Sequence, residues 1–399
     1  NSMLTRIMIR LFRKRDLARR AISRFRLWKA ERNIQRASRD GNIDVAFAPS
    51  SLNLMMVDTC NSQCVMCGKD YRACGSGQYL SQRDMETIYT HLDMGYLVDV
   101  IYGGGGEPYL NPELGAIAIQ TRKNFPFVQH TVITNAIDLK EETTGDLLEA
   151  GAHFLISVNA ATAHTYKDVA GVDGFDHLLG NLRRLVRQRG RKATQISLSM
   201  ILLRRNIEEL PAFIDLAADL GVDAVKVMYS RIYPPAYREK QGRGVVISQD
   251  DSLFFHQELS DRMVADAEQR SRARKIRFHR VPYFHERHKT RSRDCTEPWR
   301  SLFINFNGDV YPCPASEILF RPKIDAGKYQ SGNILKQSYK EFWNNRFWQE
   351  LRRTNARRGR KDVVPECLCC GGAICWEGPC HEKNHILDWS EPENSDLRL

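Results

Sequence analysis

The chain has 399 residues, of which 42% are hydrophobic and 27% charged, with a mean hydropathy of −0.46. This composition excludes a disordered or collagen-like chain, and no run of about 18 apolar residues is present to span a bilayer. The length predicts two or three domains. The net charge of +11 is local, because residues 1–40 hold 13 Lys and Arg against 3 Asp and Glu.

The basic N-terminal segment predicts one amphipathic helix. Apolar residues recur mostly at steps of three or four and form a stripe along one side, and arginines occupy positions between them. The stripe consists of Leu4, Ile7, Leu11, Ala18, Ile22 and Phe25. We expect this stripe to pack on the main domain, with Phe25 and Trp28 close to the body; the alternative is an interfacial helix on anionic lipid.

The charge distribution also bears on location and partners. Arginines interrupt every apolar run, so the segment is not a secretory signal and a cytoplasmic protein is expected. Peripheral attachment to the inner membrane face through residues 1–40 is the alternative. Because the remaining residues are nearly neutral, no nucleic-acid partner is expected.

Short β-rich runs alternate with helical patterns in the middle of the chain. Strands are predicted at residues 52–57, 98–102, 131–134, 154–158, 196–202 and 224–228. Helices are predicted at residues 143–150, 175–187, 207–220 and near 251–269. Six βα units indicate an α/β protein with a parallel sheet, either doubly wound or a partial barrel, and place the chemistry at the carboxyl ends of the strands.

The eleven cysteines form two groups separated by residues 75–294. The first group, Cys60, Cys64 and Cys67, follows the first predicted strand. Clustered cysteines in a cytosolic chain argue for metal rather than disulfides. A structural zinc site would want a fourth ligand nearby, and Cys74 is seven residues further on. A [4Fe–4S] cluster held by three thiolates would leave one iron open to a ligand that is not protein.

This loop resembles that of the radical S-adenosylmethionine (SAM) enzymes, and the resemblance extends from about residue 52 to residue 380. It implies a partial (βα)6 barrel in which the first [4Fe–4S] cluster binds SAM. Reductive cleavage of SAM then gives a 5′-deoxyadenosyl radical, which abstracts hydrogen from a substrate. An electron donor such as flavodoxin or ferredoxin is implied as a partner.

Several positions match the motifs of that family. Residues 103–108 are similar to its GGEP element, whose glycines let the backbone approach the cofactor and whose carboxylate meets the SAM ammonium. The resemblance implies cofactor binding by Met66, Gly105, Gly106, Glu107, Asn135, Ser157 and Asn159. Many relatives carry an arginine within residues 166–171, where this chain has Ala170, and Lys167 is then the candidate partner of the SAM carboxylate.

The second cysteine group resembles the iron–sulfur extension called SPASM or, when shortened, twitch. Cys295 and Cys313 flank a predicted hairpin that turns at residues 307–308. With Cys367 and Cys370 they would close an auxiliary [4Fe–4S] cluster, and a four-cysteine zinc site is the alternative.

The remaining cysteines leave the number of auxiliary clusters open. Cys375 or Cys380 can replace one of the second pair, and a two-cluster form stays open. The predicted division is a basic helical extension at residues 1–48, a radical SAM barrel at 49–290 and a SPASM/twitch-like domain at 291–399.

The resemblance leaves several substrate classes. Peptide-modifying relatives usually carry an N-terminal leader-binding module, whereas 59 residues precede Cys60 here, so a small molecule or carbohydrate that is dehydrogenated or epimerised is expected. The alternatives are a peptide- or protein-modifying maturase and a non-catalytic electron-transfer protein.

No catalytic base is predicted. The side chains after the sixth predicted strand, Tyr229, Arg231 and Tyr233, would face the cavity. Two cysteines, Cys74 and Cys369, are not assigned to a cluster and are spare thiols.

Overall fold

The computed structural model describes residues 3–68, 75–230, 247, 249–289, 295–313, 320, 324–359, 361, 363–364 and 367, with the backbone alone for residues 3–20, 249 and 287–289. One nine-stranded sheet organises them, in the order β7-β6-β5-β4-β3-β2-β1-β8-β9, and every pair is parallel except β8 and β9. The strands are β1 Ser51–Leu54, β2 Asp99–Tyr102, β3 Gln129–Thr134, β4 His153–Ser157, β5 Ile196–Leu202, β6 Ala224–Tyr229, β7 Arg277–His279, β8 Ser301–Ile304 and β9 Val310–Tyr311.

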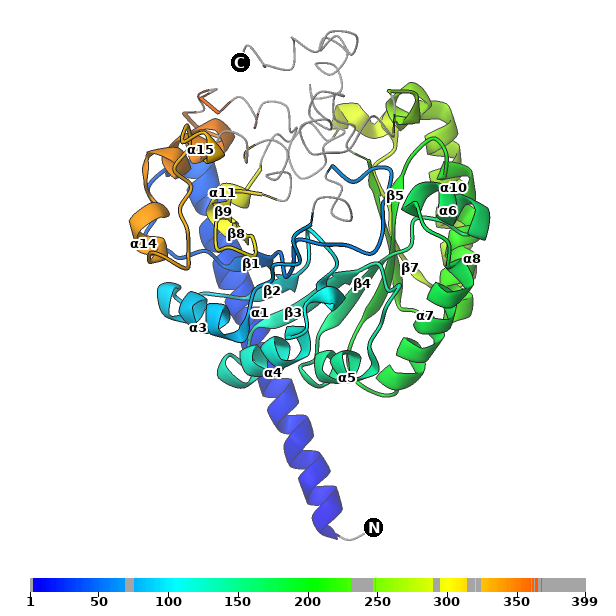
Figure 1. Ribbon diagram of the computed structural model, residues 1–399, viewed down its shortest axis with the longest axis horizontal. Helices are drawn as coiled ribbons and strands as arrows, with labels where there is room; N and C mark the ends of the chain where they lie inside the picture. The colour runs from blue at the N-terminus through cyan, green and yellow to red at the C-terminus, as the bar shows by residue number, and fades with distance from the viewer. Residues whose placement is uncertain are drawn as a thin grey trace.

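Helices follow the strands and cover the outside of the curved sheet, as Figure 1 shows for α4, α5, α7 and α8. The architecture is therefore a partial barrel and not a flat doubly wound sheet. The α-helices are α1 Met3–Asp40, α3 Gln82–His91, α4 Leu114–Asn124, α5 Glu141–Glu149, α6 Ala163–Ala170, α7 Phe175–Arg189, α8 Leu210–Leu220, α10 Gln257–Ala273, α11 Glu297–Arg300, α14 Tyr339–Phe342 and α15 Arg346–Asn355. Short 3₁₀ turns are η1 Pro108–Leu110, η2 Ile207–Glu209, η3 Gln249–Asp251, η4 Leu253–Phe255 and η5 Phe284–Lys289.

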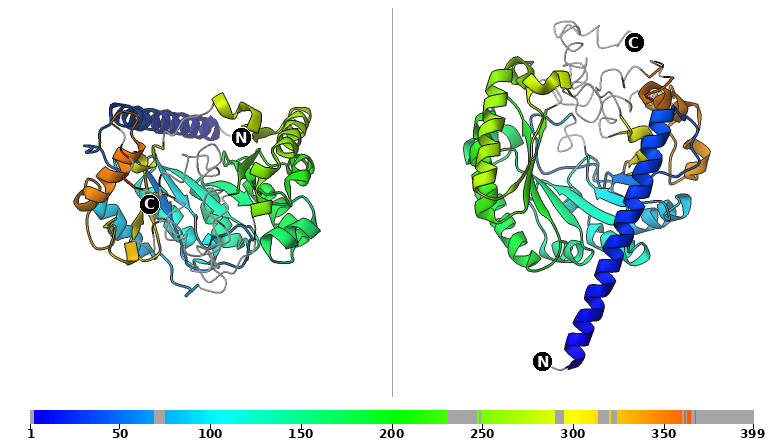
Figure 2. Two further views of the ribbon diagram at one scale, coloured as in Figure 1. Left: turned by 90° about the horizontal axis from the view of Figure 1, so that it is seen from above. Right: turned by 180° about the vertical axis from the view of Figure 1, so that it is seen from behind.

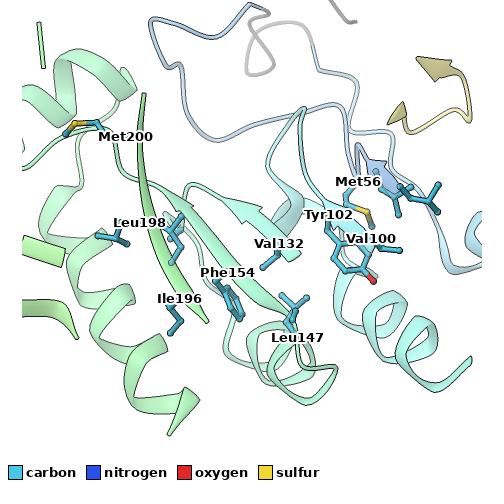
Figure 3. Packing of buried hydrophobic residues seen from close by; sticks show 14 of the residues in the cluster. Met56, Val100, Tyr102, Val132, Leu147, Phe154, Ile196, Leu198 and Met200 are labelled. Carbon is cyan, nitrogen blue, oxygen red and sulfur yellow. The ribbon is translucent and has the colours of Figure 1, made fainter. Parts of the chain in front are cut away.

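The core lies between the sheet and these helices. Strands of a covered parallel sheet are buried on both faces, and accordingly all four residues of β1 and six of the seven residues of β5 are buried. Figure 3 shows Val100, Val132 and Phe154 of successive strands side by side in this layer. α8 ends at Gly221, whose φ of 74° supplies the left-handed C-cap predicted there.

The helix α1 docks on the body through its second half. Ile34 and Ala37 are buried, Ser23 Oγ donates to the Phe127 carbonyl at 2.8 Å, and the Arg26 guanidinium donates to backbone carbonyls of the 94–97 turn. Among the helices of the described residues, none combines the length and apolar character that a bilayer crossing requires.

A different face of α1 makes this contact from the one predicted. Ile22 and Phe25, the members of the apolar stripe whose side chains are described, are 42% and 61% exposed, and Trp28 is 54% exposed. The expectation that Phe25 and Trp28 lie against the body was wrong, because the opposite side of the helix forms the interface through buried Ala30, Ile34 and Ala37 and through hydrogen bonds.

The cysteine-rich C-terminal region joins the same sheet. β8 pairs in parallel with β1, and β8 and β9 form the predicted hairpin, with Gly308 at a φ of 86° in its turn. Buried Arg352 donates to the carbonyls of Pro298 and Ile43 and lies 4.4 Å from the Trp343 ring centroid. The division at residues 1–48, 49–290 and 291–399 stays a prediction.

Candidate functional site

The first cysteine loop leaves the carboxyl end of β1 and is held by the end of α6. Gln63 N donates to the Ala170 carbonyl at 3.0 Å and Val65 N to the Val169 carbonyl at 2.9 Å. Gly171 ends α6 with a φ of 68°, and a Cβ there would lie 2.6 Å from Gln63 O. Backbone contacts therefore fix the shape of the loop.

The three thiols of this loop share one electrostatic environment. Burial, followed by the negative charge of Glu107, raises the pKa of Cys60 to about 12, and the neighbouring Cys64 and Cys67 act in the same direction. No disulfide involves these cysteines. A thiol with such a pKa ionises when it ligates metal and otherwise stays protonated.

The donor set of the first cysteine loop fits an iron–sulfur cluster. Among the described residues, no three Cys, His, Asp or Glu side chains are arranged to hold one metal ion. Three thiols of one loop are the donors that iron–sulfur clusters use. The ligand roles of Cys60, Cys64 and Cys67 stay a prediction that this chemistry supports.

A glycine-rich loop after β2 packs against the start of the cysteine loop. Gly103, Gly104 and Gly106 have positive φ, and a Cβ on Gly106 would come within 2.1 Å of Val57 O. Glu107 N donates to the Thr59 carbonyl at 2.8 Å. Glycine is required here because the two backbones touch.

Glu107 is buried beneath this contact. Its carboxylate accepts from Thr134 Oγ1 at 2.6 Å, Asn135 N at 2.8 Å and Tyr109 N at 3.2 Å. Burial raises its pKa to about 7, while these hydrogen bonds act in the opposite direction. A buried carboxylate that has no cationic side-chain partner among the described residues suits an ammonium group from a ligand.

Asn135 connects the end of β3 to the cysteine loop. Its Nδ2 donates to Asn61 Oδ1 at 2.7 Å and lies 3.7 Å from Cys60 Sγ. The structure therefore brings Glu107, Asn135 and Cys60 together.

The other residues predicted to bind the cofactor make contacts within the protein. Asn159, at a φ of 66°, uses its Oδ1 to accept from Ile201 N at 2.8 Å. Ser157 Oγ is 3.5 Å from Ser199 Oγ. Met66 packs against a small apolar cluster formed by Val65, Val169, Leu203 and Ile247. Their roles toward SAM, with that of Gly105, stay predictions.

Tyr166 is a site residue that sequence reasoning did not single out. It is 1% exposed, and its pKa is raised by burial and then by the negative charges of Cys64, Cys60 and Glu107. The phenol on α6 therefore faces the same environment as the cysteine loop. A lone tyrosine in a helix is typical of a core position, so its pattern carried no signal.

Two predicted neighbours of the site point elsewhere. Lys167 pairs with Asp173 at 2.7 Å on the surface, which argues against it as the partner of the SAM carboxylate. Tyr229 was expected to face the cavity, but its hydroxyl lies 3.0 Å from Ser260 Oγ of α10. It faces the covering helix because alternate strand residues point to opposite sides of the sheet.

The second cysteine group assembles next to the hairpin. Burial raises the pKa of Cys295, with Glu297 and then Cys367 and Cys313 acting in the same direction, so the three thiols share one electrostatic environment. The predicted fourth ligand and the remaining residues considered above lie outside the described residues: Cys370, Cys74, Cys369, Cys375, Cys380, Arg231 and Tyr233.

Both regions match known families. Residues 54–217 match the Radical SAM superfamily, and residues 295–371 match SPASM, an iron–sulfur cluster-binding domain. The PqqA peptide cyclase of Bradyrhizobium diazoefficiens is 23% identical over 338 residues, covering 82% of each chain.

Two further proteins match parts of the chain to different extents. A probable GTP 3′,8-cyclase of Metallosphaera sedula is 29% identical over 178 residues, 44% of this chain and 54% of that protein. Streptococcus suis SuiB, solved with S-adenosylmethionine bound, has a TM-score of 0.62 and 15% identity, covering 87% of this chain and 76% of that one. At this identity the structural likeness shows the fold.

Proposed function

Because the chain is a radical SAM enzyme with a C-terminal SPASM domain, we propose that it modifies a peptide or protein substrate after abstracting a hydrogen atom from it. The observation that best supports this proposal is the length of the sequence match to PqqA peptide cyclase, which covers 82% of both chains. The match to the GTP cyclase covers 44% of this chain. A small-molecule or carbohydrate substrate is therefore the less supported alternative.

The residues divide the work between two centres. When bound, the first [4Fe–4S] cluster and SAM supply the 5′-deoxyadenosyl radical, and the auxiliary cluster exchanges electrons. Cys60, Cys64 and Cys67 would hold the first cluster, and Cys295, Cys313, Cys367 and Cys370 the auxiliary one. A reductant such as flavodoxin or ferredoxin would supply the electron.

The chain's own side chains orient the cofactor. Glu107 is held by three donors, so its carboxylate is fixed where an ammonium group would need it. Asn135 couples that position to the cysteine loop through Asn61. Tyr166 would offer a hydroxyl donor to the cofactor carboxylate, in the segment where relatives carry arginine. These contacts favour one bound pose.

Anaerobic reconstitution followed by a substrate comparison tests the proposal. The protein is incubated with SAM, a reductant and either peptides encoded beside its gene or aminoglycosides and sugars. We expect a peptide to stimulate 5′-deoxyadenosine release and to lose two hydrogen atoms, or otherwise change mass, in a product seen by mass spectrometry. Conversion of a sugar with every peptide left unchanged would favour the alternative.

A further inference from the structure

The side of α1 that faces away from the body carries aromatic and basic side chains together. Phe25, Trp28, Lys29, Arg32 and Arg36 are all exposed, and we call them the outer face. We propose that the outer face binds the surface of an anionic lipid membrane.

The docking of α1 fixes which side is presented. The opposite side is committed to the protein, with Ala30, Ile34 and Ala37 buried and Asn33 Nδ2 donating to the Tyr96 hydroxyl at 3.0 Å. The Glu31 carboxylate pairs with Arg300 at 2.5 Å. The helix cannot turn the outer face inward without breaking these contacts.

The aromatic pair is a costly feature to leave in water. The rings of Phe25 and Trp28 stack with centroids 5.9 Å apart, and more than half of each side chain is exposed. Aromatic side chains with basic neighbours are typical of helices that lie in the lipid interface, where the rings enter the headgroup and acyl boundary. A stacked pair exposed on one helix face fits that boundary.

The basic side chains on the same face select the charge of the partner. The Arg32 guanidinium lies 5.4 Å from the Trp28 ring centroid, and neither Arg32 nor Lys29 has an ion pair with a carboxylate in the described part of the chain. Residues 1–40 carry ten net positive charges of the eleven in the whole chain. Such a surface attracts anionic lipid headgroups.

The placement of α1 makes the outer face accessible. Figures 1 and 2 show the helix running along one side of the body and extending past it toward the N-terminus. A nucleic-acid duplex would use the charges but not the two rings. A single strand could stack its bases on the rings, but the near-neutral body offers it no continuing basic track. Lipid is therefore the favoured partner.

Cosedimentation of the full chain with vesicles tests this proposal. Binding is expected with vesicles of phosphatidylcholine mixed with phosphatidylglycerol and not with phosphatidylcholine alone. It should weaken as salt rises, since the Debye length falls from about 10 Å at 0.1 M to about 3 Å at 1 M. No binding to the anionic vesicles at low salt would overturn the proposal.

Matched variants assign the binding to the outer face. The double variant Arg32→Glu/Arg36→Glu should lower vesicle binding by at least about tenfold. Arg183→Glu/Arg187→Glu makes the same charge change at the same spacing on exposed positions of α7 and should bind like the unchanged protein. Equal losses in the two variants would show a net-charge effect and contradict the proposal.

A second variant tests the aromatic pair independently of charge. Phe25→Ser/Trp28→Ser should also lose vesicle binding while nearly keeping its melting temperature, because more than half of each side chain is already exposed to water. Retained vesicle binding by this variant would overturn the proposal. The proposal would also fail if the substitutions only converted a dimer to a monomer, or only abolished binding to duplex RNA, because the outer face would then bind a different partner.

Discussion

Glu107 places an ionisable carboxyl group in a nearly closed position, with 2% of the residue exposed. The three hydrogen bonds that it accepts come from the ends of neighbouring segments, so one side chain links the glycine-rich loop to the end of β3. Because the carboxyl group is buried, the free energy of unfolding depends on whether a proton or a ligand cation neutralises it.

We expect Glu107 to make stability depend on pH in the protein that holds neither a cluster nor SAM. Burial raises the pKa of the folded-state carboxyl from 4.5 to about 7, so its contribution is complete below about pH 4.5 and is lost as the pH rises through about 7. The loss amounts to about 3 kcal/mol. Glu107→Gln removes this titration.

Melting temperatures over a pH series measure this effect. The difference between Glu107→Gln and the unchanged protein should move in favour of the variant from pH 5 to pH 8. Asp99, whose pKa burial raises to about 6, is present in both proteins and cancels. A constant difference across the series would contradict the prediction.

Tyr166→Phe tests the site residue that only the structure revealed. Removing the hydroxyl leaves the packing of the ring on Phe175, at a centroid distance of 5.4 Å, intact. If the hydroxyl donates to the charged cofactor, SAM affinity should fall about tenfold. Tyr89→Phe removes a hydroxyl bonded to Thr121 between α3 and α4 and should leave SAM affinity unchanged; equal effects in both would refute the role.

At the scale of elements, the junction of α6 with the cysteine loop is the contact on which the site depends. The carbonyls that end α6 accept from Gln63 N and Val65 N, and Ser62 Oγ donates to Ala170 O at 2.8 Å. A helix terminus normally leaves such carbonyls to water or to a cap. Here they fix the backbone between Cys60 and Cys67.

Gly171→Ala should disrupt this junction. The new Cβ would meet Gln63 O at 2.6 Å in addition to the strain of a positive φ. Gly221→Ala is the matched control, because it ends α8 with a φ of 74° and a ψ of 30°, close to those of Gly171, and its nearest neighbour is 3.7 Å away. We expect both to lower the melting temperature and Gly171→Ala alone to lower the iron bound per chain, as a colorimetric iron assay would measure.

The element pattern also shows what the sequence could predict. The apolar runs of β2 to β6 and the turn at Gly221 gave correct elements because burial and backbone conformation restrict those positions locally. β7 was missed because Arg277-Phe278-His279 is a short, mostly polar strand. The strand predicted at residues 52–57 ends at Leu54 in the structure, because Met55, Met56 and Val57 are buried in the segment that leads into the cysteine loop.

The site was predictable where a motif follows a strand. Glu107 and Asn135 lie where strands β2 and β3 end, and the topology brings such ends to one edge of the sheet. Tyr166 and the reversed face of α1 were not predictable, because an apolar or aromatic residue in a helical pattern carries no mark of which surface it meets.

At the scale of the whole molecule, two sets of cysteines are proposed to hold two iron–sulfur centres. Substitutions in the two sets should therefore have different effects on SAM cleavage and on product formation. Replacing Cys60, Cys64 or Cys67 by Ala should abolish 5′-deoxyadenosine formation, because each is one of three anchors. Replacing Cys295, Cys313 or Cys367 should retain SAM cleavage but remove about four irons per chain and most product. Iron counting and chromatography of 5′-deoxyadenosine measure both.

The reverse pattern would contradict the assignment. Normal SAM cleavage by the first set, or zinc in place of iron in the second, would refute the corresponding centre. Ser62→Ala tests the loop itself, because it removes one hydrogen bond of the α6 junction and a contact with Cys64 Sγ without removing a thiol.

The parallel pairing of β1 with β8 joins Ser51 to Ser301. During synthesis at about 5 to 20 residues per second, β1 emerges roughly 10 to 50 s before the strand that completes its free side. For that interval the nascent sheet presents an open edge, on the strand that leads into the cysteine loop, to any other extended chain. We therefore expect ribosome-bound chains that stop before residue 301 to recruit chaperones or to aggregate, and cluster insertion to follow release of the finished chain.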